Sequence, residues 1–303
     1  MLFSVDRLQI MNDQFIAFEF FDVTSYRRLH SFHNQKLRFL KERSFCDVYY
    51  GIAYDEKRNI FRVKKINYRK DTEQEKTFSN FEDYKVWFKK INGVTPQNKS
   101  SSKTLQGAKR DNSVGDAYVQ RILNEIHAFD FPCTDFSYDD NGLGITIKSL
   151  DNEPTFGFDF DLYEPYTKVV VEFLKRENEH VTNLTAHPFR YPWNRQKFIS
   201  LGKYVEYLNG SLYLINYSDN DHENIAVIKV LDLDCTNGEI RSDIGYKLEN
   251  RNELLEWLKI LNTDPEKALE YLSSKPCEIR DESFWNSAVK SKIGKKYILL
   301  GED

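Results

Sequence analysis

The sequence predicts a mixed α+β or α/β protein with a central sheet flanked by helices and a smaller N-terminal α+β domain. Two kinds of segment predict it. Runs of aromatic and β-branched residues are typical of strands, and longer segments carry apolar residues at helical spacing. The third observation is the length of 303 residues, which allows one large domain or two modest ones. We expect two.

Residues 1–94 are expected to form the smaller domain, with a recognition or regulatory role. It contains an amphipathic segment typical of a helix at residues 81–91, and strand-like runs at residues 15–21, 47–53 and 60–63. Residues 95–112 hold hardly any apolar side chain, which predicts a linker or mobile loop between the domains.

Residues 113–303 are expected to form the larger domain, with a helical C-terminal extension. Apolar spacing predicts helices over residues 113–130, 196–208, 252–261 and 265–273. Asn209 and Gly210 are expected to end the second of these helices. Strands are expected around residues 133–138, 144–148, 211–217 and 225–233. Inspection of the sequence finds no internal repeat.

Residues 158–175 are the most informative segment, because they are predicted to form a β-hairpin with carboxylates on one face. Both arms are rich in aromatic and β-branched residues, and residues 164 to 167 supply the turn. A turn centred on Pro165 and Tyr166 pairs Glu164 with Thr167.

This register places Asp159 opposite Glu172 and Asp161 opposite Val170. Since side chains alternate along a strand, the three acids share one face of the hairpin. Two facing carboxylates repel each other by a few tenths to about 1 kcal/mol. A divalent cation such as Mg²⁺, with Mn²⁺ as an alternative, would offset that repulsion because it prefers oxygen ligands. The alternative is an acidic face that is simply solvated.

The order of helix, acidic hairpin, helix and two strands over residues 113–234 resembles the core of the PD-(D/E)XK nuclease superfamily, which includes many restriction and repair nucleases. The resemblance implies a restriction-endonuclease-like mixed central sheet and Mg²⁺-dependent phosphodiester hydrolysis. It implies a DNA endonuclease of a restriction or defence type, with double-stranded DNA as the partner. It leaves a homodimer open, since enzymes that cut both strands often pair two active sites.

The same resemblance assigns roles to residues of the hairpin. The first metal-binding acid is Asp159 or Asp161, and the second is Glu172. The family's lysine, which helps to position or activate the attacking water, corresponds to Lys175. Such residues suit the reaction, because a carboxylate-bound metal ion shields the phosphate and supplies hydroxide while a lysine steadies the developing charge.

In the same family an acid on the preceding helix often assists. Glu125 is the candidate for this role, with Asp116 as the second choice. The family's proline before the first acid is missing, because Phe158 stands at that position.

The lysine departs from the family pattern. Lys175 follows Glu172 by three residues, which in a regular strand places it on the opposite face. A β-bulge at Phe173 and Leu174 would restore the expected face. Lys168 is the alternative, because it precedes Glu172 by four residues and shares its face without a bulge.

Three other interpretations of the acidic segment stay open, and one is a manganese-binding Asp-x-Asp of glycosyltransferases, although no Gly-rich nucleotide loop accompanies it. Asp159 and Asp161 also resemble the Asp-x-Asp opening of haloacid dehalogenase-type phosphatases, but the following residues lead into a strand rather than a helix. A catalytically inactive nucleic-acid-binding or assembly protein is the further alternative, and the displaced lysine favours it.

Two segments are candidates for contact with nucleic acid. Residues 57–70 contain no acid and interleave basic with aromatic residues, including Lys64 and Lys65. The loop after the hairpin carries Arg190 and Arg195, which would lie near the metal site. A solvated strand face and a packed loop are the alternatives.

Composition narrows the class of protein further. Hydrophobic residues make up 40% and charged residues 30%, which is an ordinary balance for a globular protein, although the mean hydropathy of −0.62 leans polar. No run approaches the roughly 18 to 20 apolar residues needed to cross a bilayer, and a secretory signal is not evident, so a cytoplasmic protein without a membrane partner is expected. The net charge of −4 argues against binding of nucleic acid by bulk charge. The four cysteines indicate neither a zinc site nor disulfides, because they lie far apart.

Overall fold

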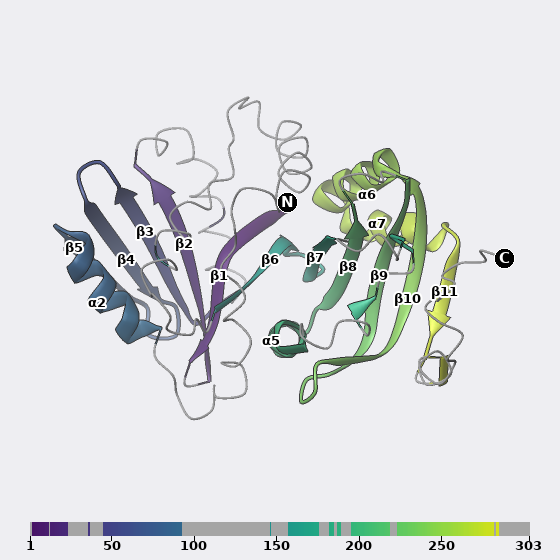
Figure 1. Cartoon of the computed structure of the whole chain (residues 1–303), viewed down its shortest axis with the longest axis horizontal. Helices are drawn as coiled ribbons and strands as arrows, with labels where there is room; N and C mark the ends of the chain where they lie inside the picture. Colours follow the sequence, from purple (N-terminus) through teal and green to yellow (C-terminus); the bar gives the residue numbers. More distant parts are fainter. Residues whose placement is uncertain are drawn as a thin grey trace. The chain divides into compact units, whose positions relative to one another are not determined.

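The chain forms two compact units, an N-terminal unit of Ser4–Asp159 and a C-terminal unit of Met1–Phe3 with Phe160–Asp303 (Figure 1). Strands and helices are mixed in both, which confirms the predicted α+β class. The predicted linker 95–112 lies outside the described residues, and the predicted domain boundaries stay predictions. The computed structural model describes residues 2–11, 13–23, 36, 45–92, 146, 157–175, 182–184, 187–188, 195–218, 223–281 and 283–284.

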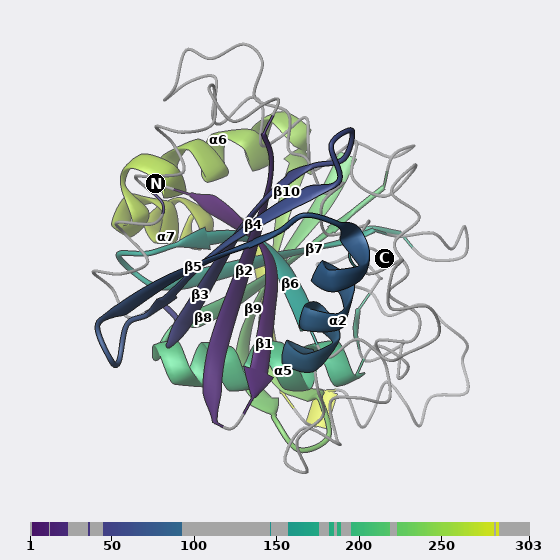
Figure 2. The same cartoon turned by 90° about the vertical axis from the view of Figure 1, so that its left-hand side faces the viewer.

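The N-terminal unit contains a sheet whose strands β1 to β5 lie side by side in chain order (Figure 1), and Figure 2 shows these strands from another side. Strands β2 and β3 are parallel, and the other neighbours are antiparallel. The elements are β1 (Phe3–Met11), β2 (Gln14–Asp22), β3 (Val48–Asp55), β4 (Ile60–Asn67), β5 (Thr72–Phe78) and helix α2 (Phe81–Ile91).

Helix α2 covers one face of this sheet. Its Tyr84 and Phe88 are buried against apolar side chains of β2, β3, β4 and β5. In the parallel pair, Phe18 faces Tyr50 and Phe20 faces Ile52, and all four belong to this core. Residues between them, such as Glu19, therefore belong to the other face of the sheet.

The C-terminal unit also contains a sheet whose strands follow chain order, from β6 to β11. Strands β7 and β8 are parallel, and the other neighbours are antiparallel. The elements are β6 (Gly157–Glu164), β7 (Val169–Lys175), α5 (Arg195–Leu208), β8 (Ser211–Tyr217), β9 (Glu223–Asp234), β10 (Glu239–Asn250), α6 (Arg251–Thr263), α7 (Pro265–Ser273) and β11 (Cys277–Arg280).

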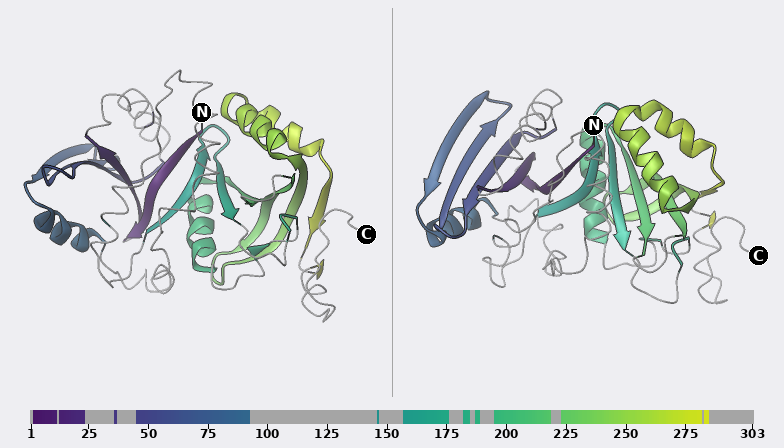
Figure 3. Two further views of the ribbon diagram at one scale, coloured as in Figure 1. Left: turned by 45° about the horizontal axis from the view of Figure 1, so that its top comes forward. Right: turned by 90° about the horizontal axis from the view of Figure 1, so that it is seen from above.

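Helices α5 and α6 lie on opposite faces of this sheet (Figure 3). Leu214 of β8 pairs with Glu172 of β7, and Lys197 of α5 contacts Glu172, so α5 covers the Leu214 face. The adjacent Tyr213 belongs to the other face, where its ring lies 5.8 Å from the ring of Trp257 in α6.

The predicted hairpin is confirmed, but its predicted register is wrong. Glu164 pairs with Val169 rather than with Thr167. Residues 165–168 form a longer turn, in which Lys168 has a φ of 58°. The buried Glu164 carboxylate stabilises this turn by accepting hydrogen bonds from the backbone N–H groups of Tyr166 at 3.1 Å and Thr167 at 2.8 Å.

The register correction changes the partners of the acids. The β6–β7 ladder runs to Leu162 opposite Val171. One step further along both strands, Asp161 comes opposite Glu172, where the sequence predicts Asp159. A shift of two residues keeps each position on its expected face, because side chains alternate with a period of two.

The two units repeat one order of elements. Each has an antiparallel hairpin (β1–β2 or β6–β7), then a strand parallel to its second arm (β3 or β8), two antiparallel strands (β4–β5 or β9–β10) and a helix (α2 or α6). The prediction that the chain has no internal repeat is therefore wrong. The repeat was missed because the two units share few identical residues.

Several predicted elements are confirmed and some are missed. The helices predicted at 81–91, 196–208, 252–261 and 265–273 are present, as are the strands predicted at 211–217 and 225–233. Strands β1, β5, β10 and β11 are not predicted. The predicted helix 113–130 and strand 133–138 lie outside the described residues. Thr146, the described residue of the predicted strand 144–148, is helical instead. Within the described part of the chain, no helix has the length and apolar character required to span a bilayer.

Candidate active site

Asp161 and Glu172 meet where the β6–β7 ladder ends. The backbone N–H of Phe173, the residue after Glu172, donates a hydrogen bond of 2.7 Å to Asp161 Oδ2. The carboxylate thus accepts a hydrogen bond from an N–H that, in a regular antiparallel ladder, would donate to a backbone carbonyl. This bond fixes the half-buried Asp161 side chain beside the strand that carries Glu172.

Glu172 forms an ion pair with Lys197, which lies in the first turn of α5. The Glu172 side chain is 3% exposed, whereas that of Lys197 is 28% exposed. The pair arises because α5 covers the face of β7 to which Glu172 belongs. We refer to Asp161, Glu172 and Lys197 as the C-terminal acid–lysine site.

The donor set of this site suits a hard cation. Among the described residues, no group of three or more His, Cys, Asp or Glu side chains is placed to hold a metal ion. Mg²⁺, however, is commonly held by one or two carboxylates, with water and substrate phosphate as further ligands. Asp161 and Glu172 supply two carboxylates on adjacent strands, each oriented by a donor, and therefore fit Mg²⁺ or Mn²⁺.

The two lysines predicted from the sequence lie elsewhere. Strand β7 pairs with β8 in unbroken register from Val169 to Lys175, so the bulge suggested at Phe173 and Leu174 is absent from this ladder. Position 175 therefore belongs to the face opposite Glu172. Lys168 lies in the turn before β7, so strand alternation does not place it beside Glu172. The geometry favours Lys197 over both.

Other predicted site residues are only partly described. Asp159 lies in β6 and Arg195 begins α5, but their side chains are outside the described part of the structure. Glu125 and Arg190 lie outside the described residues altogether. Lys64 and Lys65 lie on β4 in the N-terminal unit, so they are not part of the C-terminal acid–lysine site.

Lys64 and Lys65 have contacts within their own sheet. Lys64 Nζ lies 2.6 Å from Glu73 Oε1 of β5 in an exposed ion pair. The Lys65 Nζ lies 5.7 Å from the centroid of the Tyr50 ring. These contacts favour the solvated strand face over a surface dedicated to phosphate, although exposed ion pairs of this kind are weak.

The N-terminal unit contains the same arrangement of side chains. The β1–β2 ladder runs to Arg7 opposite Phe18, so Asp6 comes opposite Glu19 at the next step. The backbone N–H of Phe20 donates a hydrogen bond of 2.8 Å to Asp6 Oδ2. This bond corresponds to the one that Asp161 accepts in the other unit.

A lysine completes this second arrangement. Lys36 Nζ lies 2.5 Å from Glu19 Oε2, and Lys36 is helical and precedes the parallel strand β3, as Lys197 precedes β8. We refer to Asp6, Glu19 and Lys36 as the N-terminal acid–lysine site.

Neighbouring groups indicate the low polarity around the N-terminal site. Burial raises the pKa of the Tyr49 hydroxyl, and the carboxylates of Glu19 and Asp6 raise it further. Burial likewise raises the pKa of the Cys46 thiol, to which the carboxylates of Asp47 and Glu19 add. Both groups are therefore protonated at neutral pH.

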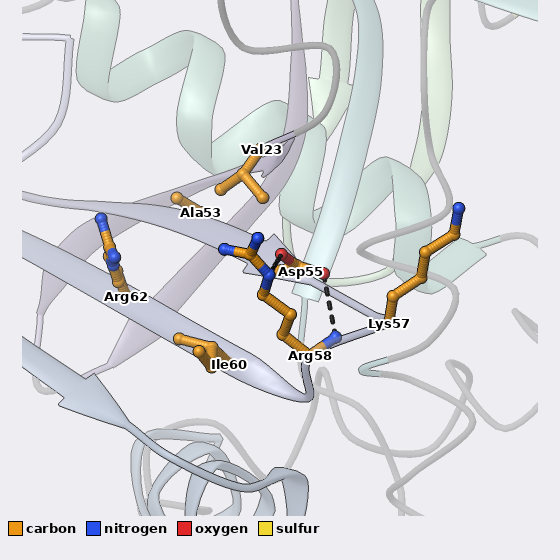
Figure 4. A pocket seen from close by; sticks show the side chains of 7 residues that line it. All are labelled: Val23, Ala53, Asp55, Lys57, Arg58, Ile60 and Arg62. Atoms are coloured by element: carbon orange, nitrogen blue, oxygen red, sulfur yellow. Dashed lines mark hydrogen bonds and ion pairs between the residues drawn. The ribbon is translucent and has the colours of Figure 1, made fainter.

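A pocket of about 450 Å³ lies at the ends of β2, β3 and β4 in the N-terminal unit (Figure 4). Lys57, Arg58 and Arg62 line it together with Asp55. Asp55 accepts a hydrogen bond of 3.0 Å from the Arg58 backbone N–H and lies 3.6 Å from its guanidinium. Asp55 offsets part of the positive charge of the pocket, so the pocket is a weaker candidate for a functional site than the acid–lysine sites are.

A further cluster of charged side chains is buried in the C-terminal unit. Arg280 of β11 forms an ion pair with Asp243 of β10, and His187 Nε2 lies 3.2 Å from Asp243 Oδ2. Burial lowers the pKa of Arg280 although Asp243 opposes this effect. All three side chains are 1% exposed or less, so the cluster is closed to a substrate.

Sequence reasoning missed Lys197, because it follows Glu172 by 25 residues. Short matches between the N-terminal and C-terminal parts of the chain could have indicated this lysine. Gln35 and Lys36 match Gln196 and Lys197, and Tyr-x-Ile-x-Tyr occurs at residues 50–54 and 213–217.

Comparison of the chain with protein-family models, with curated proteins and with solved structures gives no match.

Proposed function

We propose that the C-terminal unit is a Mg²⁺-dependent phosphodiesterase of the PD-(D/E)XK kind that cuts double-stranded DNA. The observation that carries the proposal is the convergence of Asp161, Glu172 and Lys197 at the point where the β6–β7 ladder ends. Two acids on adjacent strands and one lysine are the residue types on which this family depends.

The arrangement of elements supports the proposal. The hairpin β6–β7, the helix α5 and the parallel strand β8 follow the order of the restriction-endonuclease-like core. In this proposal Lys197, on the helix, replaces the lysine that the family carries on the strand. The restriction or defence role and the choice of DNA rest on the resemblance alone.

The side chains divide the work between them. Asp161 and Glu172 would hold Mg²⁺, which when bound neutralises phosphate charge and lowers the pKa of a bound water. The ammonium group of Lys197 pairs with the buried Glu172 carboxylate and orients it. Because Lys197 is partly exposed, it can also contact a substrate phosphate.

Plasmid DNA incubated with Mg²⁺ and purified protein tests the proposal. Glu172→Gln and Asp161→Asn should each lower the cleavage rate by about a hundredfold or more, as expected for loss of a catalytic group. Glu253→Gln is the matched control, because it also breaks a glutamate–lysine pair, with Lys275 at 2.5 Å, but on α6. Cutting that survives both Glu172→Gln and Asp161→Asn would remove the assignment.

The identity of the lysine needs its own comparison. Lys197→Met should lower the rate strongly, whereas Lys168→Met and Lys175→Met should leave it nearly unchanged. Loss of cutting in Lys175→Met together with normal cutting in Lys197→Met would show that Lys175 is the lysine of the family pattern and that Lys197 is not.

A catalytically inactive nucleic-acid-binding protein is the second candidate. The low exposure of the Glu172 side chain, 3%, favours it, because a substrate phosphate must reach that carboxylate through a bound metal. Retention of DNA in a gel-shift assay without cutting in Mg²⁺ or Mn²⁺ would support this candidate.

A further inference from the structure

We infer that the N-terminal unit is a second copy of the C-terminal fold whose acid–lysine site is closed to solvent, so that each chain carries one open site. The copy and its closure are independent of the chemistry. The consequence for DNA, that one chain cuts one strand, rests on the proposed function.

Contacts far from the sites support a shared fold. Tyr50 of β3 lies 5.7 Å from Trp87 of α2, and Tyr213 of β8 lies 5.8 Å from Trp257 of α6, between ring centroids. Both tyrosines lie in the strand parallel to the hairpin's second arm, and each tryptophan is the seventh residue of its helix. The same ring contact therefore fixes the same helix in both units.

The starts of these helices agree as well. Asn80 precedes α2 and Asn250 precedes α6, and each side chain accepts a backbone N–H of the first helical turn. Counted from these caps, the two tryptophans stand at the same position. Agreement in strand order, register, cap and ring contact is more than the acid–lysine geometry alone would require.

The two sites differ in their access to solvent. In the N-terminal site the side chains of Glu19 and Lys36 are 5% and 4% exposed, and Asp6 is buried. In the C-terminal site Lys197 is 28% exposed and Asp161 is half-buried. The Glu172 carboxylate and both N-terminal carboxylates are covered, whereas Asp161 and Lys197 of the C-terminal site are partly exposed.

A glycine and two aromatic rings explain the closure. Gly51 of β3 pairs with Glu19, and a Cβ at this position would lie 3.2 Å from the Tyr49 ring and 3.6 Å from the Phe21 ring. Tyr49 is completely buried. Its ring thus fills the space beside Glu19 that a side chain at position 51 would take.

The C-terminal unit has leucines at the corresponding positions. Leu214 pairs with Glu172, and Leu212 stands two residues before it, as Tyr49 stands before Gly51. The ammonium of Lys36 neutralises the Glu19 carboxylate inside the closed site, so in this inference the N-terminal site is structural.

Lysine acetylation of the full chain, followed by mass spectrometry, tests the closure without any assumption about activity. Lys197 should be labelled at a rate within the range of the other lysines, with the exposed Lys267 as reference. Lys36 should react at least about tenfold more slowly than Lys197, because the reagent reaches a buried amine only when the surrounding structure unfolds locally. Equal labelling of Lys36 and Lys197 would overturn the inference.

Plasmid cleavage tests the consequence of one open site. Wild type should release nicked circles before linear DNA, and the double variant Glu19→Gln/Lys36→Met, which removes both buried charges together, should do the same. Linear DNA formed directly by wild type, with nicked circles from the double variant, would show a second working site and overturn the inference. If wild type cuts nothing, the proposed function fails while the labelling experiment still decides the closure.

Discussion

The N-terminal and C-terminal acid–lysine sites have the same backbone and different surroundings. In both, an aspartate accepts the N–H of the residue after a glutamate, and the glutamate pairs with a lysine that precedes the parallel strand. Tyr49 fills the space beside the first site, whereas leucines stand at the matching positions of the second. In both units the backbone places an aspartate, a glutamate and a lysine together, and we attribute the difference in their exposure to the side chains at positions 49 and 51 and at positions 212 and 214.

The largest expected effect is a difference between Lys36 and Lys197 in how much stability the protein loses when each is replaced. Lys36→Met removes the ammonium that pairs with the buried Glu19 carboxylate, and should lower the free energy of unfolding of the N-terminal unit by about 3–5 kcal/mol. Lys197→Met should cost less, about 1–2 kcal/mol, because solvent reaches that pair. Urea denaturation of both variants measures the difference, and equal costs would break the comparison.

Replacement of Tyr49 should open the N-terminal site. Tyr49→Leu, which reproduces the residue at position 212, removes buried ring volume and should destabilise the N-terminal unit by roughly 2 kcal/mol. Acetylation of Lys36 should then accelerate towards the rate of Lys197. A folded variant in which Lys36 stays protected would show that Tyr49 is not what closes the site.

Alkaline pH should weaken the N-terminal unit. The folded state raises the pKa of the Cys46 thiol by burial, whereas the unfolded chain releases this proton near the ordinary value of 9.0. The stability due to this group is complete below that pH, and it should fall by up to about 1.4 kcal/mol per pH unit above it. Urea midpoints at pH 7, 9 and 10 measure the slope.

Cys46→Ala is the control for the alkaline effect, since it removes the thiol and should flatten the slope between pH 9 and 10. Tyr49 should add a similar dependence above its ordinary value of 10.0, because burial also raises its pKa. A slope that is the same with and without the thiol would contradict the assignment to Cys46.

The smallest expected effect is the same in both units. Asn80→Ala and Asn250→Ala each remove a helix cap and should each cost about 1 kcal/mol in the free energy of unfolding. Hydrogen exchange followed for α2 and α6 separately measures the two costs. A large cost at one cap only would weaken the case for equivalent helices.

Local patterns in the sequence predicted much of the C-terminal unit. Apolar spacing predicted α5, α6 and α7 nearly to the residue, and aromatic and β-branched residues on both sides of a turn predicted the two arms of the acidic hairpin. Glu172 was identified as a site residue because the predicted register placed it opposite an aspartate and because it matches the second acid of the family pattern. Strand β5 was missed since most of its residues are exposed and polar, so it has little apolar alternation.

The sequence by itself determined the helices α2, α5, α6 and α7 and the face of β7 to which Glu172 belongs, because both follow from spacing between near neighbours. Only the tertiary structure decided the register of the hairpin, where the Glu164 carboxylate stabilises a longer turn. The tertiary structure alone brought Lys197 to Glu172 and revealed the order of elements that both units share. Contacts between distant residues depend on how strands and helices pack, and no local pattern encodes that packing.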